Sequence, residues 1–267
     1  MLYYIHWGPD PDMIQFGDYA IRWYGLLFAS GFYIGYMLMR RFFLKEGIPE
    51  EHLDKLTLYM VLSTVIGARL GHCLFYQPDY YLSNPVEILK VWKGGLASHG
   101  AAIAIPLGLI LYSRNVSKRS PLWILDRIVI VVALAGTLIR LGNLMNSEIV
   151  GAPADIPWAF VFERISNNPV PRHPSQIYES LSYLSIFTIL YRTYYRLDGH
   201  VPHGRIFGMF LVMVFGARFI WEFTKAVQVP FEQGMPLNMG QLLSIPLVLV
   251  GAYFWYRSTQ IPVGKKL

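Results

Sequence analysis

Seven apolar stretches of this chain are close to the length that a helix needs to cross a lipid bilayer. An α-helix of about 20 mostly apolar residues spans the roughly 30 Å hydrocarbon core and satisfies its own backbone hydrogen bonds there. The stretches lie at approximately 21–39, 56–76, 100–113, 122–139, 177–195, 206–223 and 241–256, and the third is short and flanked by glycines. We therefore predict an all-α, polytopic integral membrane protein with about seven transmembrane helices.

The composition also favours a bilayer as the solvent. Hydrophobic residues make up 54% of the 267 residues and charged residues only 15%, whereas about a quarter of a soluble domain is charged. The formal net charge of +6 is compatible with an anionic partner such as nucleic acid. However, the basic residues form short clusters between apolar runs rather than a stripe along one face. We therefore expect no nucleic-acid partner.

The basic clusters predict the orientation, because lysine and arginine are retained in cytoplasmic loops. Most of them fall in alternate loops, which hold Arg40, Arg41, Lys45 and Lys55, then Arg114, Lys118 and Arg119, then Arg192, Arg196 and Arg205, and finally Arg257, Lys265 and Lys266. The opposite side holds fewer, namely Arg22, Lys90, Lys93, Arg140, Arg164, Arg172 and Lys225. We predict an amino terminus outside and a carboxyl terminus in the cytoplasm.

Two segments on the predicted outer side are more than connections. Residues 77–99 contain the amphipathic stretch VEILKVW, which is typical of a segment that lies in the headgroup plane. Residues 141–176 form the longest loop, which predicts a small outer domain or lid. No linker or repeat of fixed period divides the chain, so we expect a single transmembrane domain over residues 1–267 that includes both segments.

Arg69 lies deep in its apolar stretch, VIGARLGHCLFYQ. A buried arginine at mid-helix costs about 2.5–3.5 kcal/mol on insertion scales, so it generally faces a partner or a cavity. Two explanations stay open for Arg69. It either makes a structural ion pair or hydrogen bonds to carbonyl groups, or it binds an anion.

A second polar group follows the fourth stretch, in RLGNLMNSEIVG. Arg140 and Asn143 share a helix face, with Asn146, Glu148 and Gly151 close behind. If the helix ends near Gly142, these side chains meet at the membrane boundary and can hold a phosphate. The alternative is an interfacial helix end with a snorkelling arginine.

The sixth stretch contains VFGARFIWEF, where Arg218 and Glu222 are four residues apart among aromatics. An intrahelical ion pair would make both charges tolerable in a membrane. The same pair is compatible with anion binding, because a glutamate can hold an arginine while the guanidinium offers its other donors.

His99, in WKGGLASHGAA, precedes the short third stretch and is surrounded by glycines that permit close approach of a ligand. A lone histidine is either a hydrogen-bonded structural residue or a group for proton transfer. Cys73 is the single cysteine, so neither an internal disulfide nor a cysteine metal cluster is expected.

Several catalytic motifs are absent from the sequence, including GxSxG, HExxH and the Walker loop. We therefore expect neither a metal nor a soluble cofactor. The recurring feature is arginine at membrane depth on the outer side, which indicates a phospholipid headgroup as ligand because the guanidinium fork matches phosphate oxygens.

Seven blocks of sequence, in order, resemble the prolipoprotein diacylglyceryl transferase family. They are IRWYGLLFASGF, GARLGHCLFY, GGLASHGAAIA, RLGNLMNSEIVG, PRHPSQIYE, FGARFIWEF and NMGQLLSIP, and they run nearly end to end. The resemblance implies seven transmembrane helices in the bacterial inner membrane and an outward-facing active site. It also implies transfer of the sn-1,2-diacylglyceryl group from phosphatidylglycerol to the lipobox cysteine thiol of a preprolipoprotein signal peptide, with release of glycerol phosphate.

The resemblance also implies residue roles. Arg140 and Arg218 would hold the phosphate, Asn143, Glu148 and Gly151 would shape the pocket, and Glu222 would position Arg218. His99 would be the general base for the thiol or would orient the substrate. Tyr24 would bond a headgroup or ester oxygen or, alternatively, belong to the interfacial aromatic belt, and we add Arg69 and Asn146 to the predicted substrate-binding set.

Two positions depart from the family pattern. Val214 stands where some relatives have a tyrosine, and Ala101 stands where the family often has a second glycine after the histidine. The segment HPSQIYES at 173–180 is interpreted as mainly architectural, with Ser175 as a helix cap and with Gln176 and Glu179 near the headgroup level.

Two rival functions remain on the sequence alone. A phospholipid or anion transporter would also gather arginines and glycine-interrupted helices around a cavity, although no inverted repeat is found. A membrane scaffold for lipoprotein precursors would bind the signal peptide without turnover.

Overall fold

The computed structural model describes residues 4–17, 19–91, 94, 95, 97–226, 232 and 234–260. It contains two compact units, one formed by Met1–Leu38 with Asp126–Leu267 and the other by Met39–Leu125. Each unit is described separately below. Of the residues used for the topology prediction, Lys93, Lys265 and Lys266 lie outside the described part of the chain.

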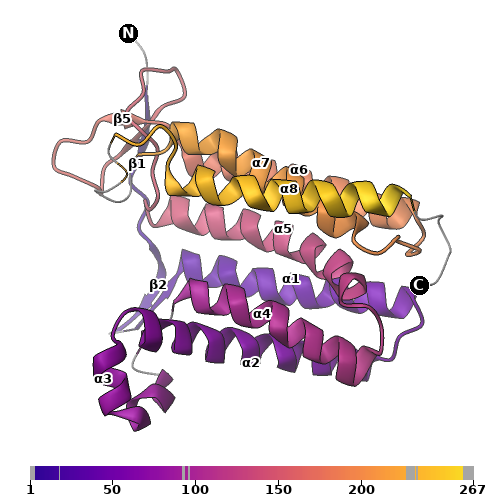
Figure 1. Ribbon diagram of the computed structural model, residues 1–267. Helices are drawn as coiled ribbons and strands as arrows, with labels where there is room; N and C mark the ends of the chain where they lie inside the picture. Colours follow the sequence, from indigo (N-terminus) through magenta and orange to yellow (C-terminus); the bar gives the residue numbers. More distant parts are fainter. Residues whose placement is uncertain are drawn as a thin grey trace. The chain divides into compact units, whose positions relative to one another are not determined.

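All seven apolar stretches lie largely within helices (Figure 1). These helices are α1 (Trp23–Lys45), α2 (Glu50–Phe75), α4 (Ser98–Tyr112), α5 (Pro121–Met145), α6 (Ser175–Arg196), α7 (Arg205–Trp221) and α8 (Met239–Thr259). Within the described residues, four segments are long and apolar enough to cross a membrane: Glu50–Phe75, Pro121–Met145, Arg205–Thr224 and Met239–Thr259. The chain is therefore a mostly helical membrane protein, and the count of seven spans stays a prediction.

Glycines allow neighbouring helices to pack at close distance within each unit. In the unit Met39–Leu125, a Cβ atom on Gly71 of α2 would lie 2.7 Å from the Cα of Gly100 in α4. In the other unit, a Cβ on Gly208 of α7 would lie 2.5 Å from the backbone nitrogen of Trp255 in α8. Small residues of this kind let helix backbones approach each other, which supplies the van der Waals contact that holds helices together in lipid.

The all-α prediction missed two small β-sheets. Strand β1 (Ile5–Trp7) pairs in parallel with β4 (Phe160–Phe162), which pairs antiparallel with β5 (Pro171–Arg172). Strands β2 (Asp12–Phe16) and β3 (Tyr19–Arg22) form a hairpin that leads directly into α1. The first sheet joins segments more than 150 positions apart in the sequence, and short strands of this kind carry little local signal.

The first sheet packs against the carboxyl-terminal end of α5. Leu144 forms a small apolar core with Phe160 and Phe162, and Trp7 packs against this core. The indole Nε1 of Trp7 also donates a hydrogen bond to the carbonyl of Leu144, at 2.9 Å. The long segment 141–176 is thus built onto the end of α5 by both apolar and polar contacts.

The segment 77–99 forms the short helix α3 (Pro78–Ser83) and a 3₁₀ turn, η1 (Pro85–Leu89). The predicted amphipathic stretch VEILKVW therefore begins in a 3₁₀ turn, and its Trp92 lies outside the described residues. Both α3 and η1 begin with a proline. Proline favours the first position of a helix, because it fixes φ and lacks the N–H that a helix start leaves unpaired.

A buried carboxylate determines where α7 begins. Asp126 on α5 is fully buried, and its two oxygens accept hydrogen bonds from the backbone nitrogens of Gly204 (2.7 Å) and Phe207 (2.9 Å). These donors belong to the first turn of α7, where backbone N–H groups have no partner within the helix. Neighbouring Arg127 donates to the carbonyl of Gly199 at 3.2 Å, so α5 holds the connection between α6 and α7.

Candidate active site

A chain of four alternating charges is buried in the unit formed by Met1–Leu38 and Asp126–Leu267. The Arg140 Nε lies 2.9 Å from Glu179 Oε2, the Lys225 Nζ lies 3.0 Å from Glu179 Oε1, and the same Nζ lies 3.0 Å from Glu222 Oε2. We call Arg140, Glu179, Lys225 and Glu222 the buried ion chain. Its side chains are 15%, 1%, 3% and 8% exposed in that order, so Arg140 is the member that a ligand reaches most easily.

Arg140 is held at a second point by the end of α5. Its Nη1 donates to Asn143 Oδ1 at 3.3 Å, and Asn143 Nδ2 in turn donates to Glu148 Oε2 at 3.1 Å. Asn146 Nδ2 donates to the other oxygen of Glu148 at 3.0 Å. The helix continues to Met145 rather than ending near Gly142, yet Arg140, Asn143, Asn146 and Glu148 form one connected polar group.

Gly151 lies where two backbone segments come very close. Its N–H donates to the carbonyl of His173 at 3.1 Å, its own carbonyl accepts from Arg172, and it forms an isolated bridge with Lys225. A Cβ atom at Gly151 would lie 2.5 Å from the Cβ of His173 and 2.7 Å from the Oγ of Ser175. The position therefore needs glycine for steric reasons, and its backbone helps to place Lys225.

Tyr24 packs beside the same end of α5. It is the second residue of α1, and a Cβ on Gly142 would lie 2.8 Å from Tyr24 Cδ2. The ring stacks on Phe28 with a centroid distance of 6.2 Å. Gly142 thus provides the space that brings the Tyr24 ring against the helix that carries Arg140.

The predicted ion pair between Arg218 and Glu222 is wrong. The helix α7 ends at Trp221, and Glu222 begins a 3₁₀ turn, η4 (Glu222–Thr224). The backbone of Glu222 is still α-helical, with its N–H bonded to the carbonyl of Arg218. The carboxylate nevertheless pairs with Lys225, which follows the 3₁₀ turn three residues later. Gly240 allows the close packing of this carboxylate, because a Cβ there would lie 2.6 Å from Glu222 Cδ.

Arg218 is left without an ion pair to any described residue, and its Nε is buried without a hydrogen-bond partner in the described part of the chain. The hydroxyl of Tyr183 interacts electrostatically with Arg218, Arg140 and Glu179. Its ring packs against α5, because a Cβ on Gly136 would lie 3.1 Å from Tyr183 Cδ2. The two arginines predicted to hold a phosphate therefore both lie near one phenol.

Arg69 has its partners within the unit Met39–Leu125. Its guanidinium donates to the carbonyls of Ile88 (2.8 Å), Gly94 (2.6 Å) and Glu87 (2.5 Å), and it lies 5.0 Å from the centre of the Tyr81 ring. The side chain thus holds the segment that follows α2, as the structural alternative expected. A direct role for Arg69 in substrate binding stays a prediction.

His99 also belongs to the unit Met39–Leu125, where it is the second residue of α4 and is exposed.

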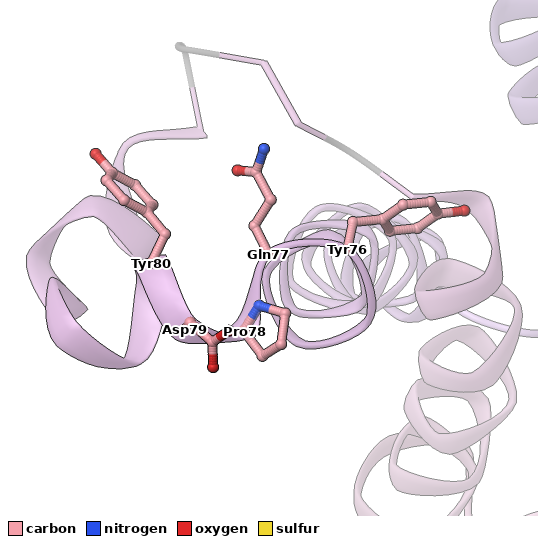
Figure 2. A pocket seen from close by; sticks show the side chains of 5 residues that line it. All are labelled: Tyr76, Gln77, Pro78, Asp79 and Tyr80. Atoms are coloured by element: carbon pink, nitrogen blue, oxygen red, sulfur yellow. The ribbon is translucent and has the colours of Figure 1, made fainter.

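A pocket of ≈ 510 Å³ lies in the same unit, at the junction between α2 and α3. Figure 2 shows its lining, which comprises Tyr76, Gln77, Pro78, Asp79 and Tyr80. None of these five residues belongs to the predicted site.

Sequence reasoning underrated Glu179 and Lys225. Glu179 and Gln176 were expected to supply polar contacts near the headgroup level. Both are fully buried within the protein, Gln176 Nε2 donates to the carbonyl of Glu148 at 2.7 Å, and their depth in the membrane stays a prediction. The sequence did contain a signal for Glu179, which lies inside an apolar stretch with no lysine or arginine within one helical turn. A buried charge of this kind requires a partner from another segment of the chain. Lys225 lacked this signal, because Glu222 lies three residues before it in the sequence.

No group of three or more His, Cys, Asp or Glu side chains is placed to hold a metal ion among the residues that the structure describes. Long apolar helices around a buried, charged site define a multi-pass membrane protein. The chain belongs to the prolipoprotein diacylglyceryl transferase family, whose model matches residues 11–257. The resemblance drawn from the sequence is thereby confirmed.

Three relatives illustrate the match. The phosphatidylglycerol–prolipoprotein diacylglyceryl transferase of Tolumonas auensis is 49% identical over 92% of this chain and 95% of the relative. The enzyme of the same name from Chloroherpeton thalassium is 48% identical over 96% of this chain and 95% of the relative. That from Porphyromonas gingivalis is 43% identical over 99% and 98%.

Proposed function

We propose that this protein transfers the sn-1,2-diacylglyceryl group of phosphatidylglycerol to the lipobox cysteine thiol of a preprolipoprotein. Family membership over most of the chain, together with the shared name of relatives at 43–49% identity, supports this activity. The enzyme would act at the outer side of the bacterial inner membrane, with the amino terminus outside and the carboxyl terminus in the cytoplasm. The distribution of lysine and arginine supports this orientation.

The reaction is a substitution at a glyceryl carbon. The thiol loses its proton to a base, the sulfur forms a bond to carbon, and the C–O bond to the phosphate breaks. Glycerol phosphate leaves with the electron pair. The protein must therefore orient the two substrates and stabilise the charge of the departing phosphate.

Arg140 and Arg218 are proposed to hold this phosphate. The observation that carries the proposal is the way Arg140 is held, with Nε on Glu179 and Nη1 on Asn143. A guanidinium has five N–H donors, and these two contacts use only two of them. Arg218, which has no ion pair with a described residue and lies near the same Tyr183 hydroxyl, supplies the second cation.

The remaining residues are proposed to shape this pocket. Asn143, Asn146 and Glu148 line its polar side at the end of α5. Gly151 lets its own backbone pack closely against His173 and Ser175. Glu222 acts through Lys225 rather than through Arg218. Tyr24 is proposed to bond a headgroup or ester oxygen, and Arg69 to act by ordering the segment around Gly94.

His99 is proposed as the base that accepts the thiol proton. It is exposed at the first turn of α4, so a peptide can reach its ring. Imidazole is the side chain best suited to proton transfer near neutral pH. A histidine that only orients the substrate would instead leave the pH dependence of turnover unchanged when it is replaced.

A reconstituted assay tests the proposed activity. Purified protein in detergent is given phosphatidylglycerol and a lipobox peptide, and both peptide mass and released glycerol phosphate are followed. We expect the peptide to gain one diacylglyceryl unit in step with glycerol phosphate release. A peptide with serine in place of the lipobox cysteine is the matched control and should stay unmodified. Binding of both substrates by folded protein without any product would refute the transferase and favour the scaffold or transporter.

A further inference from the structure

The buried ion chain contains a carboxylate that the reaction itself does not require. Glu179 lies in the first turns of α6, and its side chain is 1% exposed, so it has no access to a substrate. It nevertheless contacts two cations, Arg140 through Oε2 and Lys225 through Oε1. A charge buried this deeply costs several kcal/mol unless it is paired, which indicates a specific role for its position.

The contact to Arg140 determines the direction in which the guanidinium points. Arg140 Nε lies 2.9 Å from Glu179 Oε2 in an ion pair, and Nη1 donates a hydrogen bond to Asn143 Oδ1 at 3.3 Å. Because the guanidinium is rigid and planar, two contacts on neighbouring nitrogens fix the plane of the group. The remaining N–H donors of Arg140 then point in a defined direction. Without these two contacts the flexible side chain would let the guanidinium adopt several orientations.

The position of Glu179 is itself determined by Lys225. The Lys225 ammonium lies between Glu179 and Glu222, and its backbone is held by the bridge to Gly151 and by the N–H donated to the carbonyl of Glu222, at 3.2 Å. The four formal charges alternate and sum to zero. Removal of either inner member would leave an unpaired charge inside the protein.

We infer that Glu179 is a positioning residue for Arg140, with Lys225 as its counter-ion. The inference rests on the proposed role of Arg140 in holding the phosphate of phosphatidylglycerol. It adds that the segment HPSQIYES contributes to lipid binding through Glu179 rather than serving only as a helix start.

The test separates positioning from charge balance. Glu179→Gln leaves two cations, Arg140 and Lys225, with one carboxylate, Glu222, so the buried ion chain gains a net positive charge. The double variant Glu179→Gln with Lys225→Met keeps only Arg140 and Glu222, whose charges again sum to zero. We expect the double variant to recover the thermal midpoint of the wild type in detergent. Its KM for phosphatidylglycerol should still be raised about tenfold or more, with the KM for the lipobox peptide unchanged. A fold defect would instead lower kcat and leave both KM values alone.

A second variant covers the case in which the double substitution does not fold. Glu179→Asp keeps the charge but withdraws the carboxylate from Arg140 by about 1.5 Å, the length of one C–C bond. We expect a folded enzyme with a raised KM for phosphatidylglycerol. Ser180→Ala is the matched control, because Ser180 is also buried on α6 and donates to the Thr137 carbonyl at 3.3 Å, and its KM should stay within twofold of wild type.

A KM for phosphatidylglycerol within twofold of wild type in folded Glu179→Asp, or in the folded double variant, would overturn the inference. Arg140→Ala distinguishes this failure from that of the proposed function. If Arg140→Ala raises the KM and the Glu179 variants do not, only the positioning role fails. If Arg140→Ala leaves the KM unchanged, the phosphate site itself has been misplaced, and the role of Glu179 falls with it.

Discussion

Replacing Arg140 with lysine tests whether the geometry of the guanidinium matters beyond its charge. Lysine keeps the positive charge but has a single nitrogen, so it cannot contact Glu179 and Asn143 at 2.9 and 3.3 Å and also present a fork to a phosphate. The loss of one preorganised donor to a developing anion costs about 2.7–4 kcal/mol, which is 10²–10³-fold in rate. We expect kcat/KM for phosphatidylglycerol to fall by about 10²-fold in Arg140→Lys and further in Arg140→Ala.

The assay is initial-rate transfer at a saturating lipobox peptide concentration with varied phosphatidylglycerol, together with the thermal midpoint of each variant in the same detergent. Arg192→Lys is the matched control, since Arg192 is exposed near the far end of α6, and it should behave as wild type. A folded Arg140→Lys enzyme whose kcat/KM lies within threefold of wild type would refute the reasoning, because charge alone would then suffice.

Three further predictions concern residues held by the fold. Gly151→Ala places a Cβ 2.5 Å from that of His173, so we expect overpacking that costs about 1–3 kcal/mol and a lower thermal midpoint together with lost transfer; an unchanged midpoint would contradict the steric argument. Asp126→Ala removes the acceptor of two buried backbone hydrogen bonds at the start of α7, which costs about 1–3 kcal/mol for a donor left unpaired, so unfolding in detergent should occur well below the wild-type temperature, with Asp126→Asn intermediate. Arg69→Lys loses several of its carbonyl contacts, so backbone amides of residues 86–91 should exchange hydrogen faster than in the wild type while those of α5 are unaffected; unchanged exchange at residues 86–91 would exclude the holding role.

The apolar pattern of the sequence determined where the helices form. All seven predicted stretches lie largely within helices because an apolar segment of this length satisfies its backbone only within itself. The blocks RLGNLMNSE and RHPSQIYE also identified the family, which the match over residues 11–257 confirms. Arg140, Asn143, Asn146 and Glu148 were recognised as one polar group because they are neighbours in the sequence, and they contact each other as expected.

Only the tertiary structure decided which charges pair. A spacing of four residues predicted that Arg218 and Glu222 would interact, but Glu222 pairs with Lys225, which follows the 3₁₀ turn that begins at Glu222. Likewise, Arg140 and Glu179 are 39 positions apart and meet across α5 and α6. Partner choice among buried charges depends on distances between helices and on where each helix ends, which the local pattern of a single sequence does not encode.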